Sequence, residues 1–233
     1  YTFDLASATG LTRMEFGGGT IDTTTLVVDS YVADTTIQLG STIGGAVQEF
    51  SGSVDVNMVN SAGSADVLNL RLQDTDDSAQ SNDLDAAGIE TLNIELTTDA
   101  ESHTFSLAGV TQTVGSAGTI NITGGVATDG LVISDVATTV TTIDASGSAG
   151  SLTLSDRGSS AMTITGGTDG DSLRMENKND VMTGGTGTDT LVVAQNSVLG
   201  GYAIDLSSTT DQLTTYNGAA NSAVQVGFEN VDL

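Results

Sequence analysis

The sequence predicts an all-β protein, built as a β-solenoid or β-roll with additional irregular strands. Short runs of alternating or β-branched apolar residues dominate the 233-residue chain, and clusters of glycine, serine, aspartate, asparagine and threonine, which favour turns, separate them. Helical periodicity is nearly absent. From Ile120 onward, apolar pairs recur roughly every nine to eleven positions, which is the spacing of a solenoid.

Each expected strand is a short run of alternating or β-branched apolar side chains. In chain order these runs are residues 24–28, 54–59, 67–72, 92–96, 119–122, 131–133, 152–154, 162–164 and 191–193. A short helical turn is expected only at residues 83–87. We place a boundary between an irregular β-rich region at residues 1–117 and a β-solenoid region at residues 118–233. Since no linker separates the two regions, they can form one continuous β-structure.

The charge of the chain excludes several classes of function. Thirty acidic side chains face five basic ones, for a net charge of −25, so phosphate backbones would repel the chain and nucleic acid is not an expected partner. No cysteine is present, which excludes disulfides and thiolate metal sites. The single histidine, His103, leaves little for zinc or Ser-His-Asp chemistry, and we expect it to be a surface or half-buried residue. No apolar run approaches the length of a membrane span.

The same composition favours a folded chain that needs a counterion. Hydrophobic residues make up 38% of the sequence and charged residues only 15%, which is too apolar for a solvated acidic tail. Self-repulsion would destabilise a compact state at this charge unless cations neutralise it. Because Tyr1 opens directly into a β-like segment, we also expect the chain to be a portion of a larger protein.

The sharpest motif lies in a predicted β-roll at residues 166–192. Residues 184–192, GGTGTDTLV, fit the nonapeptide G-G-x-G-x-D-x-U-x, in which U is a large apolar residue, at every fixed position. Eighteen residues earlier, GGTDGDSLR keeps both glycines, the aspartate and the leucine. The segment between these two lacks the glycines but keeps the frame, so Asp171, Asp180 and Asp189 stand nine residues apart.

This frame predicts a calcium site. Two nonapeptides complete one coil, so residues eighteen apart stack at the β-sheet spacing of about 4.8 Å. Asp171 and Asp189 then lie one above the other and repel unless a cation sits between them. Carboxylates from both turns, with backbone carbonyls exposed by the glycines, supply the oxygens that calcium takes at about 2.4 Å. Asp180 lies on the opposite edge, where the turn lacks glycines, so we expect a weaker or absent site there.

The candidate metal-binding residues extend beyond this pair. Those within residues 166–192 are Asp169, Asp171, Asp180 and Asp189, together with Gly166, Thr168, Gly184 and Thr186.

Two further acidic segments are candidates for calcium. Asp129 belongs to a degenerate nonapeptide that is out of frame with the later repeats by six residues, which requires an intervening loop or a different coil length. The alternative is that Asp129 is a solvated aspartate in a turn. Asp74 and Asp76 open an acidic segment without the glycine and flanking helices of an EF-hand. It is either a calcium-organised loop or an exposed acidic loop.

The nonapeptides resemble the RTX repeats of bacterial proteins exported by type I secretion. The residues that approach them, 140–146, 150–154 and 163–167, are similar to the corresponding region of bacterial surface-layer (S-layer) proteins. The strand GIETLNI at 88–94 recurs in kind as GFENVDL at 227–233, and both are similar to S-layer segments, including those that tile α-proteobacterial cells. The specific repeat covers about 27 residues, and the looser similarity covers most of the chain after residue 50.

The resemblance implies a structural role rather than an enzyme. We expect a secreted, extracellular, cell-surface segment of a self-assembling S-layer or matrix protein, in which Ca²⁺ drives folding and assembly into a homo-oligomeric lattice or filament. A cell-surface polysaccharide could anchor it through regions outside this chain. The alternatives are a non-catalytic RTX calcium module of a secreted enzyme, and an RTX adhesin or ice-binding solenoid. The irregular placement of Thr141, Thr142, Thr163 and Thr165 speaks against ice binding.

Overall fold

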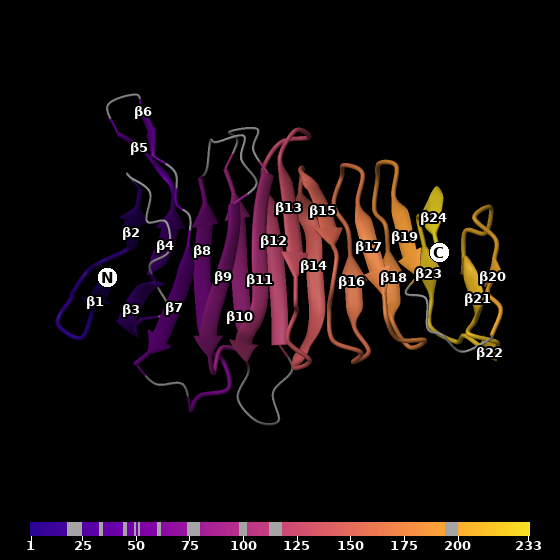
Figure 1. The fold of residues 1–233 in the computed structure, drawn as a ribbon, viewed down its shortest axis with the longest axis horizontal. Helices are drawn as coiled ribbons and strands as arrows, with labels where there is room; N and C mark the ends of the chain where they lie inside the picture. Colours follow the sequence, from indigo (N-terminus) through magenta and orange to yellow (C-terminus); the bar gives the residue numbers. More distant parts are fainter. Residues whose placement is uncertain are drawn as a thin grey trace.

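The alternating apolar residues build strands that pair in parallel with the strands one coil before and one coil after them. The computed structural model describes residues 1–17, 25–32, 35–43, 46–48, 50, 52–59, 62–73, 80–97, 102–111, 118–193 and 200–233. These residues form an elongated solenoid of two parallel sheets (Figure 1). Successive strands alternate between the two sheets, so a coil contributes one strand to each. The predicted all-β solenoid is confirmed.

Within the described residues, the larger sheet has ten strands and is called sheet A. Its strands, in spatial order, are β1 (Thr2–Asp4), β3 (Thr25–Tyr31), β7 (Ser53–Met58), β9 (Gln80–Ala87), β11 (Ser102–Thr111), β13 (Gly130–Ser134), β15 (Ser151–Leu154), β17 (Ser172–Met175), β19 (Thr190–Val193) and β24 (Asn230–Asp232). Sheet B has nine: β2 (Arg13–Phe16), β4 (Thr36–Leu39), β8 (Val67–Leu72), β10 (Thr91–Leu96), β12 (Gly118–Gly124), β14 (Val140–Ser148), β16 (Thr163–Thr165), β18 (Val181–Thr183) and β23 (Gln225–Val226).

The coils are shortest in the β-roll. In sheet B, Asn93 pairs with Asn121, which is a sequence separation of 28 (121 − 93). In sheet A, Leu173 pairs with Leu191, which is a separation of 18 (191 − 173). The predicted coil of two nonapeptides is therefore confirmed for the β-roll. The earlier strands belong to the same sheets but are separated by longer connections.

The two sheets continue through the boundary that the sequence suggests at residues 117/118. β12, which begins at Gly118, pairs with β10 on one side and with β14 on the other. The irregular N-terminal strands therefore share both sheets with the β-roll. Whether residues 1–117 and 118–233 behave as separate domains stays a prediction.

The core of the solenoid is a continuous column of inward-facing apolar side chains. Along β8, the residues Leu68, Leu70 and Leu72 are buried while the residues between them are half-buried, and a similar alternation recurs in β10. The inward residues of successive coils stack on one another, so Ile143, Ile164 and Met182 form one row. Burial of these rows supplies the apolar contact that the short strands cannot make alone.

The expected helical turn at residues 83–87 is wrong, because these residues belong to the strand β9. Leu84 and Ala86 are buried, whereas Asp83 and Asp85 are exposed, and this period of two is that of a strand. Over the described residues, no helix is long and apolar enough to cross a membrane.

A small antiparallel sheet covers the C-terminal end of the solenoid. It consists of β20 (Ala203–Ile204), β21 (Leu213–Tyr216) and β22 (Ala219–Ala220), and it lies beyond β24 in Figure 1. Leu213 is fully buried, and the Gln212 Nε2 donates to the Phe228 carbonyl oxygen at 2.8 Å. The sheet shields the last coil from further strand pairing. A second antiparallel pair, β5 (Ser41–Ile43) with β6 (Ala46–Gln48), projects near the other end.

Candidate metal centre

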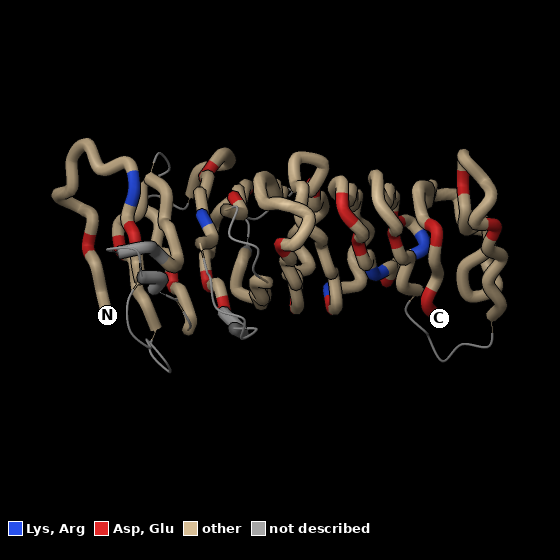
Figure 2. Tube along the Cα trace, turned by 90° about the horizontal axis from the view of Figure 1, so that it is seen from above, with Lys and Arg blue, Asp and Glu red and all other residues tan. Residues whose placement is uncertain are grey.

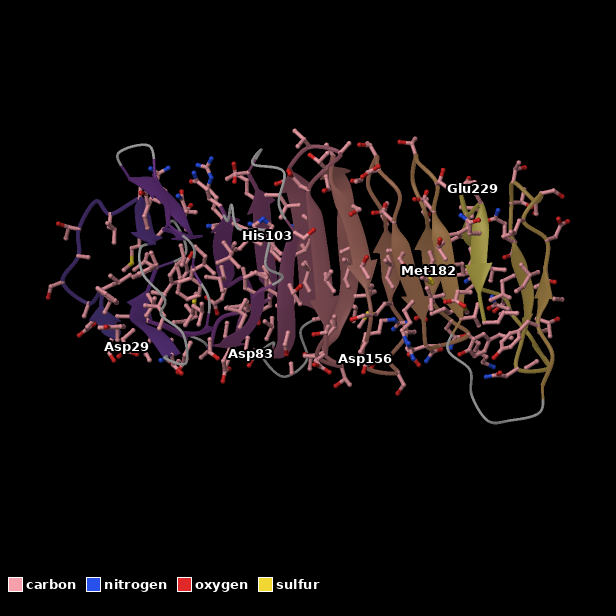
Figure 3. All side chains as sticks on the ribbon, turned by 45° about the horizontal axis from the view of Figure 1, so that its top comes forward. Asp29, Asp83, His103, Asp156, Met182 and Glu229 are labelled. Carbon is pink, nitrogen blue, oxygen red and sulfur yellow. The ribbon has the colours of Figure 1, made fainter. Side chains whose placement is uncertain are left out.

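The repeated frame of the nonapeptides places acidic residues directly before strands of sheet A. Asp171 precedes β17, Asp189 precedes β19 and Glu229 precedes β24, and these three strands are neighbours. The side chains of Asp171 and Asp189 are buried, with 2% and 1% of their surface exposed. Glu229 marks this long edge of the solenoid in Figure 3. The structure therefore brings Asp171 and Asp189 into one column, as the spacing predicts, and adds Glu229 to it.

Each acid in this column binds the main chain of the preceding coil. The Asp171 amide donates to Asp189 Oδ1 at 2.8 Å, and the Asp189 amide donates to Glu229 Oε2 at 2.8 Å. Asp171 Oδ1 in turn accepts from the Leu152 amide at 2.6 Å. These bonds link four successive coils through carboxylates.

The second carboxylate oxygens face the interior of the turns. Asp171 Oδ2 accepts from the Gly167 amide at 2.6 Å. Asp189 Oδ2 is buried and has no hydrogen-bond partner among the described residues. A buried carboxylate oxygen without a partner is costly, so a cation within reach would stabilise it.

Two glycines let the main chain of the next coil approach these turns closely. A Cβ at Gly184 would overlap the Gly227 carbonyl oxygen and would lie 2.7 Å from Asp189 Oδ2. A Cβ at Gly166 would overlap both the Gly184 carbonyl oxygen and Asp171 Oδ2. At each turn, a carboxylate oxygen of the same turn and a carbonyl oxygen of the next coil therefore lie too close to the glycine for any side chain to fit.

This arrangement fits a hard cation held largely by main-chain oxygens. Within the described part of the chain, no three histidine, aspartate or glutamate side chains converge as metal ligands. A site here would thus combine one or two carboxylates with carbonyl oxygens, which are ligands that calcium accepts.

The remaining predicted residues of these turns lie at the rim. Asp169 is half-buried, whereas Thr168 and Thr186 are exposed. The Thr186 amide donates to the Gly167 carbonyl oxygen at 3.1 Å, so the two turns stack directly.

The electrostatics of the column follow from burial. Burial raises the pKa of the Asp171 carboxyl from 3.8 to about 6, the amides of Leu152 and Gly167 oppose this shift, and the Asp189 and Asp169 carboxylates add to it. Burial also raises the pKa of Asp189, and Glu229 and Asp169 raise it further. In the absence of a cation, ionisation of these buried carboxyls lowers the stability of the folded state.

Asp180 lies on the opposite edge and has a different partner. Its Oδ1 accepts from the Met162 amide at 2.9 Å, and its Oδ2 forms a fully buried ion pair with Arg157. Burial raises the pKa of Asp180 and lowers that of Arg157, while the attraction between the two charges opposes both shifts. An arginine therefore stands where the sequence predicts a weaker or absent metal site.

Asp129 occupies the same edge as Asp171, two coils earlier. Gly130 pairs with Ser151, whereas Ser172 pairs with Thr190, so a coil longer than that of the β-roll explains why this nonapeptide is out of frame. Asp129 is buried, its Oδ2 accepts from the Val126 amide at 2.6 Å, and its Oδ1 has no partner among the described residues. The interpretation of Asp129 as a solvated turn residue is wrong, because the turn encloses it.

The two other candidate ligands, Asp74 and Asp76, lie outside the described residues. Acidic residues that do lie on the outer face of sheet A include Asp29, Asp55 and Asp85 (Figure 3 shows Asp29). Burial raises the pKa of Asp55, and the carboxylates of Asp85 and Asp29 raise it further. Figure 2 shows acidic positions along the whole length of the solenoid.

Sequence reasoning missed a second pair of the same kind. The Asp66 amide donates to Glu90 Oε2 at 2.8 Å, as the Asp189 amide does to Glu229. Asp66 Oδ2 is also a buried atom without a partner among the described residues, and a Cβ at Gly63 would lie 2.7 Å from it. A sequence pattern could have found this pair: an acidic residue stands two positions before an inward apolar residue. It recurs at Asp66, Glu90, Asp129, Asp171, Asp180, Asp189 and Glu229.

His103 differs from its expected exposure. It lies on β11 with 4% of its surface exposed, so it is an interior residue rather than a surface or half-buried one. The alternation of β11 turns it inward beside Phe105.

Comparisons with known proteins add no relative. No family model matches the chain, and no curated protein and no solved structure is significantly similar to it. The interpretation of the turns therefore rests on their residues and geometry.

Calcium-free protein should lose stability as the pH rises from about 4 to about 6. The folded state holds the Asp171 proton with a pKa of about 6 against 3.8 for the ordinary group, so ionisation disfavours the folded state in this window. The loss is at most about 3 kcal/mol for this group, and the raised pKa of Asp189 acts in the same direction. Urea unfolding at several pH values measures it. Equal or greater stability at the higher pH would contradict the raised pKa.

Replacing Gly184 by alanine should disrupt the close packing of this turn against Gly227 and Asp189. The new Cβ would overlap the Gly227 carbonyl oxygen, so we expect a loss of about 1–3 kcal/mol in the free energy of unfolding. Gly201→Ala is the matched control, because a Cβ there meets nothing within 4 Å. Chemical denaturation of both variants makes the comparison, and equal losses would show that the crowding at Gly184 is unimportant.

Proposed function

We propose that this chain is a structural, calcium-binding segment of a secreted, self-assembling surface-layer or extracellular matrix protein of the RTX type. The observation that carries the proposal is the column formed by Asp171, Asp189 and Glu229, in which the buried Asp189 Oδ2 lacks a hydrogen-bond partner among the described residues and lies beside the closely packed Gly184 turn. The absence of cysteine and the net charge of −25 are consistent with a chain that metal ions hold together.

The residues of the column couple calcium to folding. Asp171 and Asp189 are brought together only when the coils stack, so an unfolded chain offers no preformed site. A bound calcium ion supplies two positive charges that offset the carboxylates. Because the ion binds only the stacked state, its binding free energy adds to the stability of that state. At low calcium, the same carboxylates disfavour stacking of their coils, which lowers the stability of the folded chain and favours export.

The outer surface supports assembly through the same cations. Asp29, Asp55 and Asp85 lie on neighbouring strands of the outer face of sheet A, where a neighbouring molecule with the same face could share ions with them. The raised pKa of Asp55 reflects the burial and mutual repulsion of this group, which a bridging cation relieves. A lattice or filament of identical chains is the assembly that we propose.

Calcium should raise the unfolding temperature of the chain, and Asp189→Asn should reduce that rise. At a calcium concentration of about 100 times the dissociation constant, one site contributes about 2.7 kcal/mol. Asp135→Asn is the control, because Asp135 is exposed and asparagine accepts its left-handed φ of 53°. Circular dichroism melts with calcium and with EGTA provide the measurement. An unchanged melt in EGTA would refute calcium-linked folding.

The same samples test assembly separately. Light scattering and electron microscopy after calcium addition should show sheets or filaments of the wild-type chain. A protein that gains thermal stability with calcium but stays monomeric at millimolar calcium would retain the calcium site and lose the lattice role.

A second candidate function, ice binding, is supported by one row on sheet B. Thr91, Thr119, Thr142 and Thr163 stand in register on four successive strands. The threonines that look irregular in the sequence are therefore aligned by coils of different length. Beside this row, an outward ladder of asparagine side chains links Asn69, Asn93 and Asn121, with Nδ2 to Oδ1 distances of 2.8 and 2.9 Å. A regular threonine row on a flat sheet is typical of ice-binding solenoids.

Ice binding predicts thermal hysteresis that depends on this row. Thr119→Lys, in the middle of the row, should abolish the hysteresis, because the lysine interrupts the flat face. Thr153→Lys is the matched control on the outer face of sheet A, where Thr153 is equally half-buried. Nanolitre osmometry measures the freezing-point difference. Wild-type chain without hysteresis would exclude this function and leave the calcium proposal untouched.

A further inference from the structure

The edge of the solenoid opposite to the acidic column has its own buried charge. Arg157 lies in the connection between β15 and β16, and its side chain is fully buried in a chain that has only five basic residues. Its neighbour Asp156 marks this edge in Figure 3, across the solenoid from Glu229. A fully buried arginine needs a specific set of acceptors.

The acceptors of Arg157 come from two stacked turns. From its own turn, Nη1 donates to the carbonyl oxygens of Gly158 at 3.2 Å and Ser160 at 3.1 Å. From the next turn, Nε donates to the Arg174 carbonyl oxygen at 2.9 Å, and Nη2 donates to Asp180 Oδ2. Three main-chain carbonyls and one carboxylate therefore surround the guanidinium. This is the kind of oxygen set that calcium takes between two turns.

The two edges are built on the same plan. Asp180 Oδ1 accepts from the amide of Met162, eighteen residues earlier, and Asp189 Oδ1 accepts from the amide of Asp171, also eighteen residues earlier. The other oxygen differs most: Asp180 Oδ2 receives Arg157, whereas Asp189 Oδ2 has no partner among the described residues. The guanidinium thus stands at the position where, on the opposite edge, Asp189 Oδ2 has no partner among the described residues.

We propose that the Arg157 guanidinium is the resident cation of this oxygen cage and replaces a metal ion there, so that this edge of the solenoid closes without calcium. The Asp180 turn thus keeps a set of oxygen ligands of the kind that binds a metal ion. The Arg157 side chain, which comes from the preceding coil, occupies it. This inference stands apart from the calcium proposal, because the contacts of Arg157 exist whether or not the opposite edge binds metal.

The two edges would therefore depend on different cations, one on Arg157 and the other on calcium. At low calcium, the edge of Asp180 keeps β15 to β18 in register through Arg157, and the edge of Asp171 and Asp189 stays open. Calcium then has to close one edge rather than two. The chain therefore contains a metal-free starting point for stacking the β-roll.

Amide hydrogen exchange of the wild-type chain, with calcium and with EGTA, separates the two edges. In EGTA, we expect the amides of Met162 and Asn177, which donate to Asp180, to stay protected. The amides of Gly167 and Asp171, which donate to Asp171 and Asp189, should exchange at least about tenfold faster. Equal loss at both edges would overturn the inference. If EGTA changes neither edge, the calcium proposal fails, while the Asp180 edge behaves as inferred.

Arg157→Ala tests whether the cage itself is a cation site. In EGTA, this variant should lose protection at Met162 and Asn177, and millimolar calcium should restore it, since calcium can then enter the emptied cage. Arg174→Ala is the matched control: the Arg174 side chain is 35% exposed and pairs with Glu176, and its carbonyl oxygen is kept. Protection in Arg157→Ala that persists in EGTA, or that calcium does not restore, would overturn the proposal.

Discussion

Stacking of identical corner positions is the constraint on which this structure depends. A parallel solenoid places the residue before each strand directly over its counterpart one coil away, at the β-sheet spacing of about 4.8 Å. In this chain, that position is repeatedly acidic, so Asp171, Asp189 and Glu229 form one column. Removing such carboxylates from water costs several kcal/mol per ion unless opposite charge accompanies them. The fold therefore creates its own demand for cations.

The protein meets this demand in three ways. Main-chain amides of the preceding coil donate to one oxygen of each stacked carboxylate, as the Asp171 amide does to Asp189. At one edge, the second oxygen of Asp189 has no partner among the described residues and lies beside a glycine turn that packs against a carbonyl oxygen of the next coil, where a cation could bind it. At the other edge, a buried arginine supplies the charge. The amide hydrogen bonds add no charge and act within adjacent coils. Binding at the Asp189 edge would make stability depend on the calcium concentration, whereas the Arg157 edge needs no metal ion.

The same stacking shapes the two flat faces. Outward residues repeat along the solenoid axis, so the threonine row, the asparagine ladder and the acidic rows of sheet A all arise from one register. Such faces can order ions, water or a neighbouring chain over many coils. The antiparallel sheet β20–β22 covers the C-terminal end, which leaves the faces and edges as the surfaces on which the coils present repeated groups.

The sequence by itself determined the all-β class, the eighteen-residue coil of the β-roll and the stacking of Asp171 on Asp189, because strict nonapeptide spacing converts directly into register. It could not show that Glu229 joins the column, since the connection between β19 and β24 hides the repeat. Asp66 with Glu90 and the threonine row escaped for a related reason: the longer, unequal coils before the β-roll change the sequence distance between stacked positions. Only the tertiary structure decided the place of Arg157, because its cage is assembled from carbonyl oxygens of two coils that sequence spacing does not reveal.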